Sequence, residues 1–330
     1  MIEPSFFDDF WTQLFKSESA MLLKNHDEIL AAFHIGSTAI GIKNRLCVDV
    51  LLVCEKPPTY YEEYLGQFGY KRITEDHSGL VFFSERHRQA RFKIYLYQSN
   101  DNEIERYLSI RDYLKANADL LQKFEGFDIH SQNYEVIKKK FFTEIAEDVY
   151  GWNTKKETIF DSKRILIQRW RPRDWINFHS LSSNPEVIGF IYTGYPFSKK
   201  DSEDFIATQI NHMDRLGYCF FKLKVKGEHR IAGFCGIQPL GVSSNVEMGW
   251  WLLPDLQGHG YVTEVGKAVI EYIQHHFQIS SIKAYCHINH HRSMAVMKRL
   301  GFKSLGVGVT DVFGMHPLSK PVHRFTLDFI

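Results

Sequence analysis

A glycine-containing turn in the second half of the chain has the residue types of an anion-binding site. A strand-like run from Val246 to Leu253 ends at Pro254, and the residues Gln257-Gly258-His259-Gly260 then lead into an amphipathic pattern with helical spacing. Glycine lets backbone N–H groups face outward without an obstructing Cβ, and a helix N-terminus adds about half a positive charge. We therefore expect a pyrophosphate cradle at this turn; the alternative is a tight turn that binds no ligand.

A second strand, turn and helix follow directly. The strand Ile282–Ile288 leads through the polar turn Asn289–Ser293 into the helix Met294–Leu300, which the pair Gly301-Phe302 closes. This order of elements resembles the core of the GNAT acetyltransferase superfamily. It is most similar to the Rim-like branch, whose members acetylate protein N-termini and ribosomal proteins, beside relatives that act on small amines. The resemblance covers nearly all of residues 158–330 and implies a mixed-sheet fold with acetyl-CoA as the co-substrate.

The same resemblance implies which residues bind acetyl-CoA. Gln257 and Gly260 match the loop pattern of the family, whereas Val262 stands where a small residue is usual. By resemblance, the pyrophosphate is bound by the backbone amides of Gly258, His259, Gly260, Tyr261, Val262 and Thr263. The strand end Trp250-Trp251-Leu252 would pair with the pantetheine arm, and either Asn289 or His290 would hydrogen-bond to that arm.

Acetyl transfer to an amine needs a base for the incoming ammonium and a proton donor for the departing thiolate. Glu247 is the candidate base, because strand alternation places it on the face of Gly249 and Trp251; the alternative is a carboxylate held by neighbouring donors or solvated. Many superfamily members have a tyrosine acid four residues before the Gly-Phe pair, but that position is Met297 here. Rim-like enzymes use a serine eight residues before the glycine, so Ser293 is the candidate thiolate donor, with helix N-capping as the alternative.

The first half of the chain resembles a different family. A Gly-Ser-Thr turn at residues 36–38, followed by an apolar strand that carries Asp49, resembles the nucleotidyltransferase-like GrpB family over most of residues 5–150. Active nucleotidyltransferases hold Mg²⁺ with two carboxylates at positions i and i+2 of one strand, but Leu51 replaces the second carboxylate here. We therefore expect a nucleotide-binding or scaffolding domain without two-metal catalysis. Its candidate nucleotide-binding residues are Gly36, Ser37 and Asp49.

Together the patterns predict two domains of the α/β (α+β) class. We place the nucleotidyltransferase-like α/β domain at residues 1–153 and the mixed-sheet GNAT domain at residues 154–330, with the polar passage 151–157 between them. In the first domain we predict helices over residues 6–30, 60–68, 103–115 and 134–149 and strands over residues 47–53, 80–83 and 91–97. In the second we predict strands over residues 164–170, 218–225, 230–239 and 245–253 and helices over residues 174–181 and 202–216. We expect Arg111 and Asp112 as a structural pair at a helix start.

Composition narrows the class of protein. The net charge of +1 provides no field for non-specific binding to nucleic acid or an anionic membrane. The five cysteines show no CxxC spacing, and no apolar run approaches the roughly 18 residues of a membrane span, so we expect a soluble cytoplasmic protein. The histidines near the site lack zinc spacing, and we expect no metal at His275, His276, His287, His290 and His291.

These inferences predict an enzyme that transfers acetyl from acetyl-CoA to a primary amine, either a protein N-terminus or a small amine, by direct attack. By family analogy, residues 190–196 and 218–220 line the acceptor side. Two alternatives stay open. One is a CoA or nucleotide sensor without turnover, and the other is a bifunctional enzyme with nucleotidyltransferase activity in its N-terminal domain.

Overall fold

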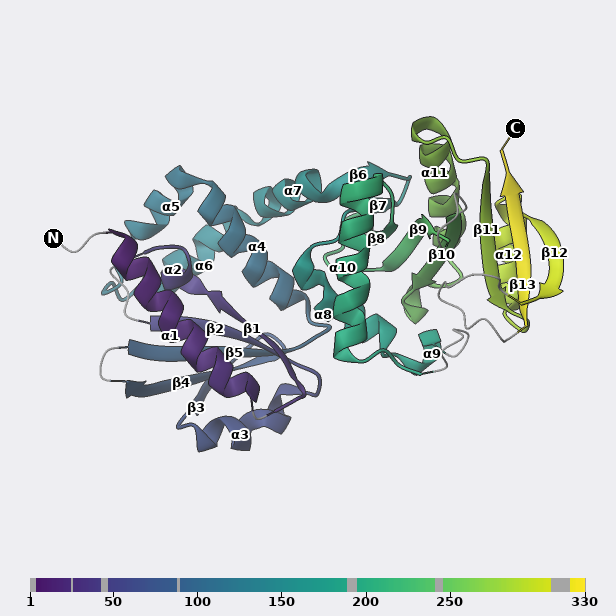
Figure 1. Ribbon diagram of the computed structural model, residues 1–330. Coiled ribbons are helices and arrows are strands. Elements are labelled where there is room, and N and C mark those ends of the chain that lie inside the picture. Colours follow the sequence, from purple (N-terminus) through teal and green to yellow (C-terminus); the bar gives the residue numbers. More distant parts are fainter. Residues whose placement is uncertain are drawn as a thin grey trace. The chain divides into compact units, whose positions relative to one another are not determined.

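The structure, a computed structural model, describes residues 4–24, 26–42, 47–87, 90–188, 195–240, 246–309 and 321–329. The chain divides into two compact units, Met1–Lys156 (unit 1) and Glu157–Ile330 (unit 2) (Figure 1). Each unit contains its own mixed sheet with helices, which confirms the predicted α/β (α+β) class. In the described part of the chain we find no helix that combines the length and the apolar character of a membrane crossing.

Unit 1 is built on a five-stranded sheet in the order β1-β2-β5-β4-β3. Its strands are β1 (Ile29–Ile35), β2 (Cys47–Cys54), β3 (Lys71–Asp76), β4 (Gly79–His87) and β5 (Ala90–Gln98). β2 and β5 run parallel, and the other neighbours run antiparallel. The helices are α1 (Pro4–Lys24), α2 (Gly36–Ala39), η1 (Pro58–Tyr61), α3 (Glu62–Gln67), α4 (Asn102–Ala116), α5 (Ala118–Glu125), α6 (Tyr134–Glu144) and α7 (Ala146–Glu157). One apolar cluster joins the strands to α1 and α3, and another gathers α4, α5 and α6.

Unit 2 is built on an eight-stranded sheet in the order β12-β13-β11-β10-β9-β8-β7-β6. Its strands are β6 (Thr158–Asp161), β7 (Ile165–Gln168), β8 (Phe220–Val225), β9 (Gly233–Pro239), β10 (Val246–Leu252), β11 (Ser281–His287), β12 (Lys303–Gly308) and β13 (Val322–Asp328). β10 and β11 are parallel, and the other neighbours are antiparallel. The helices are η2 (Pro172–Asp174), α8 (Trp175–Ser182), α9 (Pro185–Ile188), α10 (Lys199–Leu216), η3 (Pro254–Leu256), α11 (Tyr261–His276) and α12 (His291–Arg299).

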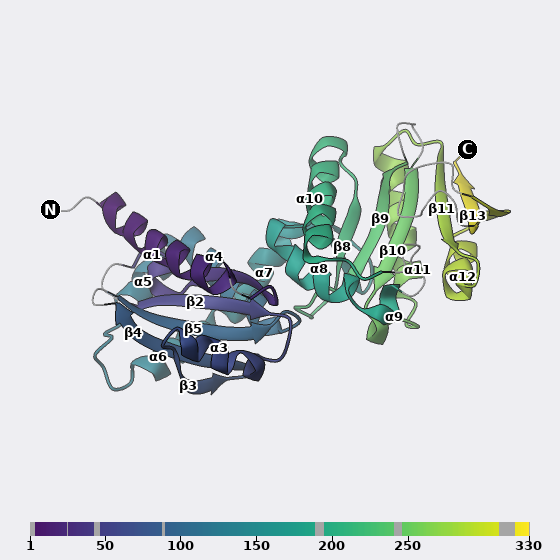
Figure 2. The ribbon, with the colours of Figure 1, turned by 60° about the horizontal axis from the view of Figure 1, so that its bottom comes forward.

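Helices cover both faces of the unit 2 sheet (Figure 2). Aromatic side chains join these helices to the strands. On one face, Phe178 of α8 and Phe205 of α10 stack on Trp251 of β10, with ring centroids 5.9 and 6.4 Å apart. On the other face, Tyr272 of α11 meets Phe221 of β8 at 5.9 Å. Because successive strand residues point to opposite faces, the residues of β10 alternate between the α8/α10 side and the α11 side.

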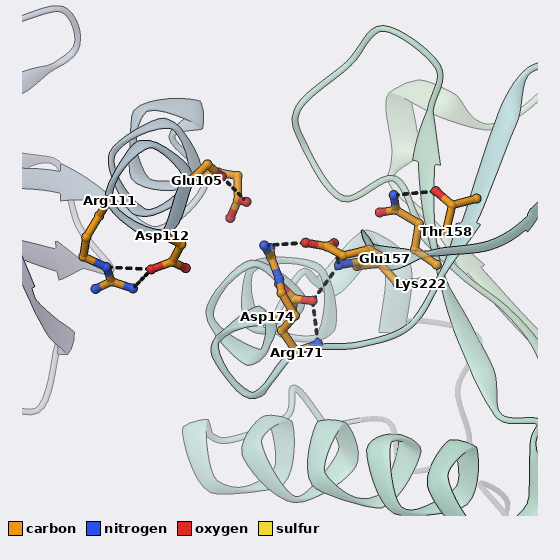
Figure 3. Close-up of polar contacts among 10 residues, drawn as sticks. Glu105, Arg111, Asp112, Glu157, Thr158, Arg171, Asp174 and Lys222 are labelled. Carbon is orange, nitrogen blue, oxygen red and sulfur yellow. Dashed lines mark hydrogen bonds and ion pairs between the residues drawn. The ribbon is translucent and has the colours of Figure 1, made fainter. Parts of the chain in front are cut away.

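A group of four charged side chains is buried near the start of unit 2 (Figure 3). Lys222 of β8 is fully buried, and its Nζ lies 2.7 Å from Oε2 of Glu157 and 2.8 Å from Oδ2 of Asp174. Arg171 completes the group, with contacts of 2.7 Å to Glu157 and 2.8 Å to Asp174. Two cations and two carboxylates therefore neutralise one another in the interior, where an unpaired charge would be costly.

The structure differs from the predicted elements at several places, and three of these differences have a clear physical reason. The first helix ends at Lys24 rather than near residue 30, because the following apolar run forms β1 against β2. The polar passage 151–157 is helical and belongs to α7, where Trp152 packs edge-on against Tyr113. Strand β3 was not predicted, because its exposed residues lack apolar alternation and only its pairing with β4 makes it a strand.

Arg111 and Asp112 do form an ion pair, with Arg111 Nη2 2.7 Å from Asp112 Oδ1 (Figure 3). They lie inside α4, so the prediction that they mark a helix start is wrong. Arg111 also donates to the carbonyl oxygen of His34 at 3.1 Å, and so joins α4 to the end of β1.

Candidate active site

The central strands of unit 2 are paired only where they begin. The register between β10 and β11 joins Val246 to Ile282 and Glu247 to Lys283. β10 then continues to Leu252 with β9 on its other side, while β11 continues to His287 with β13. The edge of β10 that faces β11 beyond Glu247 can therefore offer backbone N–H and C=O groups to an extended ligand.

The turn after β10 has the backbone conformation expected of an anion cradle. Gly258 and Gly260 have φ angles of +85° and +79°, a left-handed conformation that costs other residues about 1–2 kcal/mol. Gly260 is the N-cap of α11, and Glu264 N donates to Gly260 O at 3.1 Å. Within the described part of the chain, no side chain caps this end. The amides of residues 261–263 therefore have no acceptor within the helix. A Cβ added to Gly258 would meet no atom of the described residues within 4 Å, so these residues leave room for a phosphate beside the turn.

Arg164, in the β6–β7 connection, holds this turn from the side. Its Nε lies 2.7 Å from Glu264 Oε2, its Nη2 donates to His259 O at 3.0 Å, and its guanidinium lies 4.3 Å from the ring centroid of Tyr261. The other carboxylate oxygen, Glu264 Oε1, accepts from Ser162 Oγ and from Arg164 N, both at 2.7 Å. Burial alone would raise the pKa of Glu264, but these hydrogen bonds lower it overall.

Neither Arg164 nor Glu264 was singled out in the sequence. A usable signal was present, because Glu264 is an acidic residue in the first turn of a helix that we expected to bind an anion. A carboxylate at that place would repel a pyrophosphate unless a cation neutralised it. The sequence could therefore have predicted a cationic partner, although not which residue provides it.

Gln257 connects the end of β10 to the first turn of α12. Its Nε2 donates to Leu252 O at 3.2 Å, and its Oε1 accepts from Arg292 Nη1 of α12 at 3.3 Å. The side chains of Trp251 and Leu252 are buried, and Trp250 is half-buried. Residues 250–252 all remain in register with β9, so the pantetheine-binding role predicted for them concerns their other backbone edge.

Glu247 lies at the point where the two strands separate. It is 4% exposed and accepts a hydrogen bond from Nε2 of Gln238 on β9. A Cβ on Gly249, two residues further, would meet the ring of Phe220, and that ring stacks with Phe205 of α10. The side chain of Glu247 therefore lies on the α8/α10 face of the sheet.

Ser293 lies on the opposite face. It is 6% exposed, in the first turn of α12, and hydrogen-bonds to the side chain of Cys286 on β11. Burial raises the pKa of the Cys286 thiol to about 11, so this thiol is protonated at neutral pH. Cys286 is three residues beyond Lys283, the register partner of Glu247, so its side chain points to the other face. The N-cap of α12 is His290, which shows that the N-cap alternative for Ser293 is wrong.

His290 and Asn289 occupy the turn between β11 and α12. Burial, followed by the charges of His287 and Arg292, lowers the pKa of His290 to about 4, so its ring is neutral at pH 7. Asn289 is exposed, and its backbone N–H donates to Nδ1 of His287 at 3.1 Å. A neutral imidazole can hydrogen-bond to a pantetheine amide, and the choice between the two residues stays open. Among the residues described, no three histidine, cysteine or acidic side chains are placed to hold a metal ion.

In unit 1 the candidate residues of the Gly-Ser-Thr turn and Asp49 lie together. Gly36 has a φ angle of +71°, and a Cβ on it would lie 2.1 Å from Asp49 Oδ2, so only glycine allows this close approach. Ser37 is buried in the same turn, and Thr38 Oγ1 donates to Cys47 O at 3.0 Å.

The neighbouring strand gives Asp49 a basic rather than an acidic environment. The β2–β5 register places Lys93 beside Asp49 and Tyr95 beside Leu51. Burial and Asp49 raise the pKa of Cys47 to about 12, against the opposing charges of Lys93, Arg91 and Lys138. These cations therefore lie near the position where a two-metal site would need carboxylates.

Comparison with known families decides the class of unit 2. Residues 164–303 match the family model described as "Acetyltransferase (GNAT) domain". The chain carries a GNAT acetyltransferase domain. It is therefore an acyl-CoA-dependent N-acetyltransferase with acetyl-CoA as its co-substrate. Residues 5–164 match the model described as "GrpB protein", so a GrpB domain precedes the acetyltransferase domain.

Two relatives from Bacillus subtilis (strain 168) match different parts of the chain. The uncharacterized N-acetyltransferase YnaD is 26% identical over 145 residues, which are 44% of this chain and 82% of YnaD. The UPF0157 protein YqkA is 23% identical over 175 residues, which are 52% of this chain, and the chain spans about half (48%) of YqkA.

Two solved acetyltransferase structures are each similar to about half of the chain. RimL, a ribosomal L7/L12 alpha-N-protein acetyltransferase in complex with coenzyme A, is 17% identical with a TM-score of 0.44, over 52% of this chain and 98% of RimL. A GNAT-family acetyltransferase from Bacillus anthracis is 20% identical with a TM-score of 0.43, over 51% of this chain and 96% of that protein.

The predicted acceptor side is only partly described. Residues 190–194 lie outside the described residues, and Tyr195, next to them, is 78% exposed. Phe220 and Cys219 are buried, and Tyr218 is half-buried against Phe277 of the segment after α11. The sequence prediction that these residues line the acceptor side therefore stays a prediction.

Proposed function

We propose that the acetyltransferase domain transfers acetyl from acetyl-CoA to a primary amine by direct attack, with Glu247 as the base and Ser293 as the thiolate donor. The amine nitrogen attacks the thioester carbonyl, the C–S bond breaks, the nitrogen loses a proton and the sulfur gains one. The observation that carries the proposal is the separation of β10 from β11, with Glu247 on one face and the Ser293–Cys286 pair on the other. A thioester in the gap would meet a base on one side and a proton donor on the other.

The cradle supports the same proposal. Gly258 to Thr263 can bind the pyrophosphate, and the backbone of residues 250–252 can pair with the pantetheine arm. A panel of acceptors tests the acceptor class: peptides with free N-termini, the same peptides with blocked N-termini, and small polyamines. We expect acceptor-dependent release of CoA with at least one primary amine and none with the blocked peptides. Binding of acetyl-CoA without CoA release for any acceptor in the panel would contradict the proposal and favour the sensor alternative.

Replacement of the proposed thiolate donor gives a prediction of its own. Ser293→Ala should lower kcat by roughly 10²-fold, because proton donation to a leaving group contributes 10²–10⁴-fold. The defect should shrink when the acetyl donor has a more acidic thiol, because that thiolate needs less help to leave. Rates with both donors, measured for wild type and variant, check this. A defect of equal size with both donors would indicate that Ser293 acts only by packing against Cys286.

For the GrpB domain we propose binding of a nucleotide without two-metal catalysis. The observation that favours this is Lys93, which lies beside Asp49 in register while Leu51 and Tyr95 occupy the other positions of that face. A cation at that place can contact a phosphate directly, whereas Mg²⁺ needs oxygen ligands. The nucleotidyltransferase alternative instead requires Mg²⁺-dependent turnover.

Calorimetric titration with ATP tests this second proposal. We expect similar affinity in Mg²⁺ and in EDTA, weaker binding by Lys93→Glu, and no pyrophosphate release. The exposed Lys71→Glu on β3 is the matched control and should bind ATP like the wild type. Pyrophosphate release that requires Mg²⁺ and disappears in Asp49→Ala would overturn the proposal, and so would a lack of ATP binding under both conditions.

A further inference from the structure

The turn at residues 258–263 depends on contacts that come from far away in the sequence. Arg164 and Ser162 lie in the connection between β6 and β7, at one edge of the sheet order, about 100 residues before the turn. Arg164 reaches both sides of the turn, because it contacts the carboxylate of Glu264 inside α11 and the carbonyl of His259 before α11.

The contacts match the shape of the arginine side chain. A guanidinium presents several N–H donors in a rigid plane, so Nε can engage Glu264 while Nη2 engages His259 O, at 2.7 and 3.0 Å. The His259 carbonyl is thereby engaged by Arg164 instead of being left to face a bound anion. Because a carbonyl that faced a phosphate would repel it, this contact keeps the anion site composed of N–H groups.

The carboxylate of Glu264 would repel a bound pyrophosphate, and residues of the same β6–β7 connection neutralise it. Glu264 lies in the first turn of α11, where a bound pyrophosphate would meet its negative charge. Its two oxygens accept from Arg164 Nε, Arg164 N and Ser162 Oγ, all at 2.7 Å. The charge is thus neutralised and directed toward the β6–β7 connection.

We infer that Arg164 and Glu264 are positioning residues that hold the 258–263 turn as a pyrophosphate site. They thereby set the preference of the enzyme for acetyl-CoA over thioesters that lack the nucleotide. This rests on the proposed role of the turn in binding acetyl-CoA. It adds that the selectivity for the nucleotide end depends on two side chains outside the Gly258–Gly260 sequence.

The size of the effect follows from the fraction of molecules in the competent conformation. If loss of the Arg164 contacts leaves the cradle formed in about a tenth of the molecules, the Kd for CoA rises about tenfold, because the apparent Kd is the intrinsic value divided by that fraction. A thioester without a pyrophosphate does not use the cradle, so its turnover should not change.

The test compares Arg164→Gln, Arg164→Lys and Glu264→Gln with the wild type. Arg72→Gln in unit 1 is the matched control, because Arg72 is similarly exposed (37% against 41% for Arg164) and also pairs with carboxylates, Glu62 and Glu75. Calorimetric Kd values for CoA and kcat/KM for acetyl-CoA and for S-acetylpantetheine are measured on the full chain.

We expect Arg164→Gln to raise the Kd for CoA and the KM for acetyl-CoA about tenfold, with kcat/KM for S-acetylpantetheine unchanged. Glu264→Gln should change the same quantities less, because the glutamine still accepts from Ser162. Arg164→Lys should restore the Kd for CoA only in part, because one ammonium group cannot contact Glu264 and the His259 carbonyl at once. The control should match the wild type.

Equal losses with both thioesters would overturn the inference, because they would indicate a general structural role. So would an unchanged Kd for CoA in Arg164→Gln. Failure of the proposed acetyl transfer can be distinguished from failure of this inference. If the wild type binds CoA but acetylates no amine, the Kd values for CoA still decide whether Arg164 positions the cradle.

Discussion

Glu247→Gln should lower kcat with an amine acceptor by about 10²–10⁴-fold while leaving the KM for acetyl-CoA unchanged. The size is that of a lost general base, and an unchanged KM is expected because the proposed contacts to acetyl-CoA involve the backbone of residues 250–252 and 258–263 and not the side chain of Glu247. Glutamine keeps the shape of the side chain and can still interact with Gln238. Steady-state kinetics at saturating acceptor measure the effect.

The alternative for Glu247 is a buried carboxylate that only holds Gln238. That role predicts a lower melting temperature with a normal kcat, so the two quantities are measured on the same preparation. Glu271→Gln is the control, because Glu271 is an exposed glutamate on α11 of the same unit. A wild-type kcat in Glu247→Gln would rule out the base assignment.

A pH profile sharpens the same prediction. The limb of the wild-type kcat profile that rises with pH should flatten in Glu247→Gln, because the variant has no carboxylate to lose its proton at that position. An unaltered rising limb at a lower overall rate would assign the proton transfer to a different group or to water.

Lys222→Met should destabilise the protein by about 3–5 kcal/mol, because it leaves two buried carboxylates with a single cation. Lys222 is fully buried, and Asp174 is 1% exposed, so water cannot replace the lost ammonium. Against a total stability of about 5–15 kcal/mol for a domain, such a loss is severe. Urea unfolding followed by tryptophan fluorescence measures the change, since four of the six tryptophans, Trp170, Trp175, Trp250 and Trp251, lie in unit 2.

Two further variants separate the loss of the Lys222 charge from any change in the packing of its methylene groups. Lys200→Met removes an exposed lysine that pairs with Asp204 and should leave the free energy of unfolding nearly unchanged. Adding Asp174→Asn to Lys222→Met restores neutrality, so the double variant should be more stable than the sum of the single changes predicts. Strict additivity would show that the group does not act as a unit.

The group also predicts how stability depends on pH. Burial alone would raise the pKa of Asp174, but the charges of Arg171 and Lys222 hold it well below its usual value of 3.8. A lowered folded-state pKa adds stability at pH values above the unfolded pKa, and that stability is lost as the pH falls. The difference between wild type and Lys222→Met should therefore narrow as the pH is lowered below about 4.

Local patterns were sufficient for the strands and helices that carry the cofactor site. Residues close together in the sequence encode β10, the glycine turn and the apolar face of α11. On that face, Val265, Val269 and Ile273 are all fully buried. Periodicity and glycine conformations determine such elements without reference to the rest of the chain.

Contacts between distant segments could not be predicted in the same way. Glu264 meets Arg164 across 100 residues, and Lys222 meets Glu157 across 65. Nothing in the sequence around Glu264 or Lys222 identifies its partner. Both pairs depend on the order of the strands in the sheet and on the edge at which the connecting segment lies. Strand β3 shows the same limit, since its polar exposed sequence becomes a strand only through hydrogen bonds to β4.

We propose that acetyl moves from acetyl-CoA to an amine in the gap between β10 and β11. The most direct measurement is a stoichiometric one, in which CoA release is followed with a thiol reagent while mass spectrometry follows the acceptor. We predict one acetyl group gained by the amine for each CoA released, and loss of both signals together in Glu247→Gln. Tight binding of acetyl-CoA with no acetylated amine across the acceptor panel would contradict the account and show that the domain binds its co-substrate without turnover.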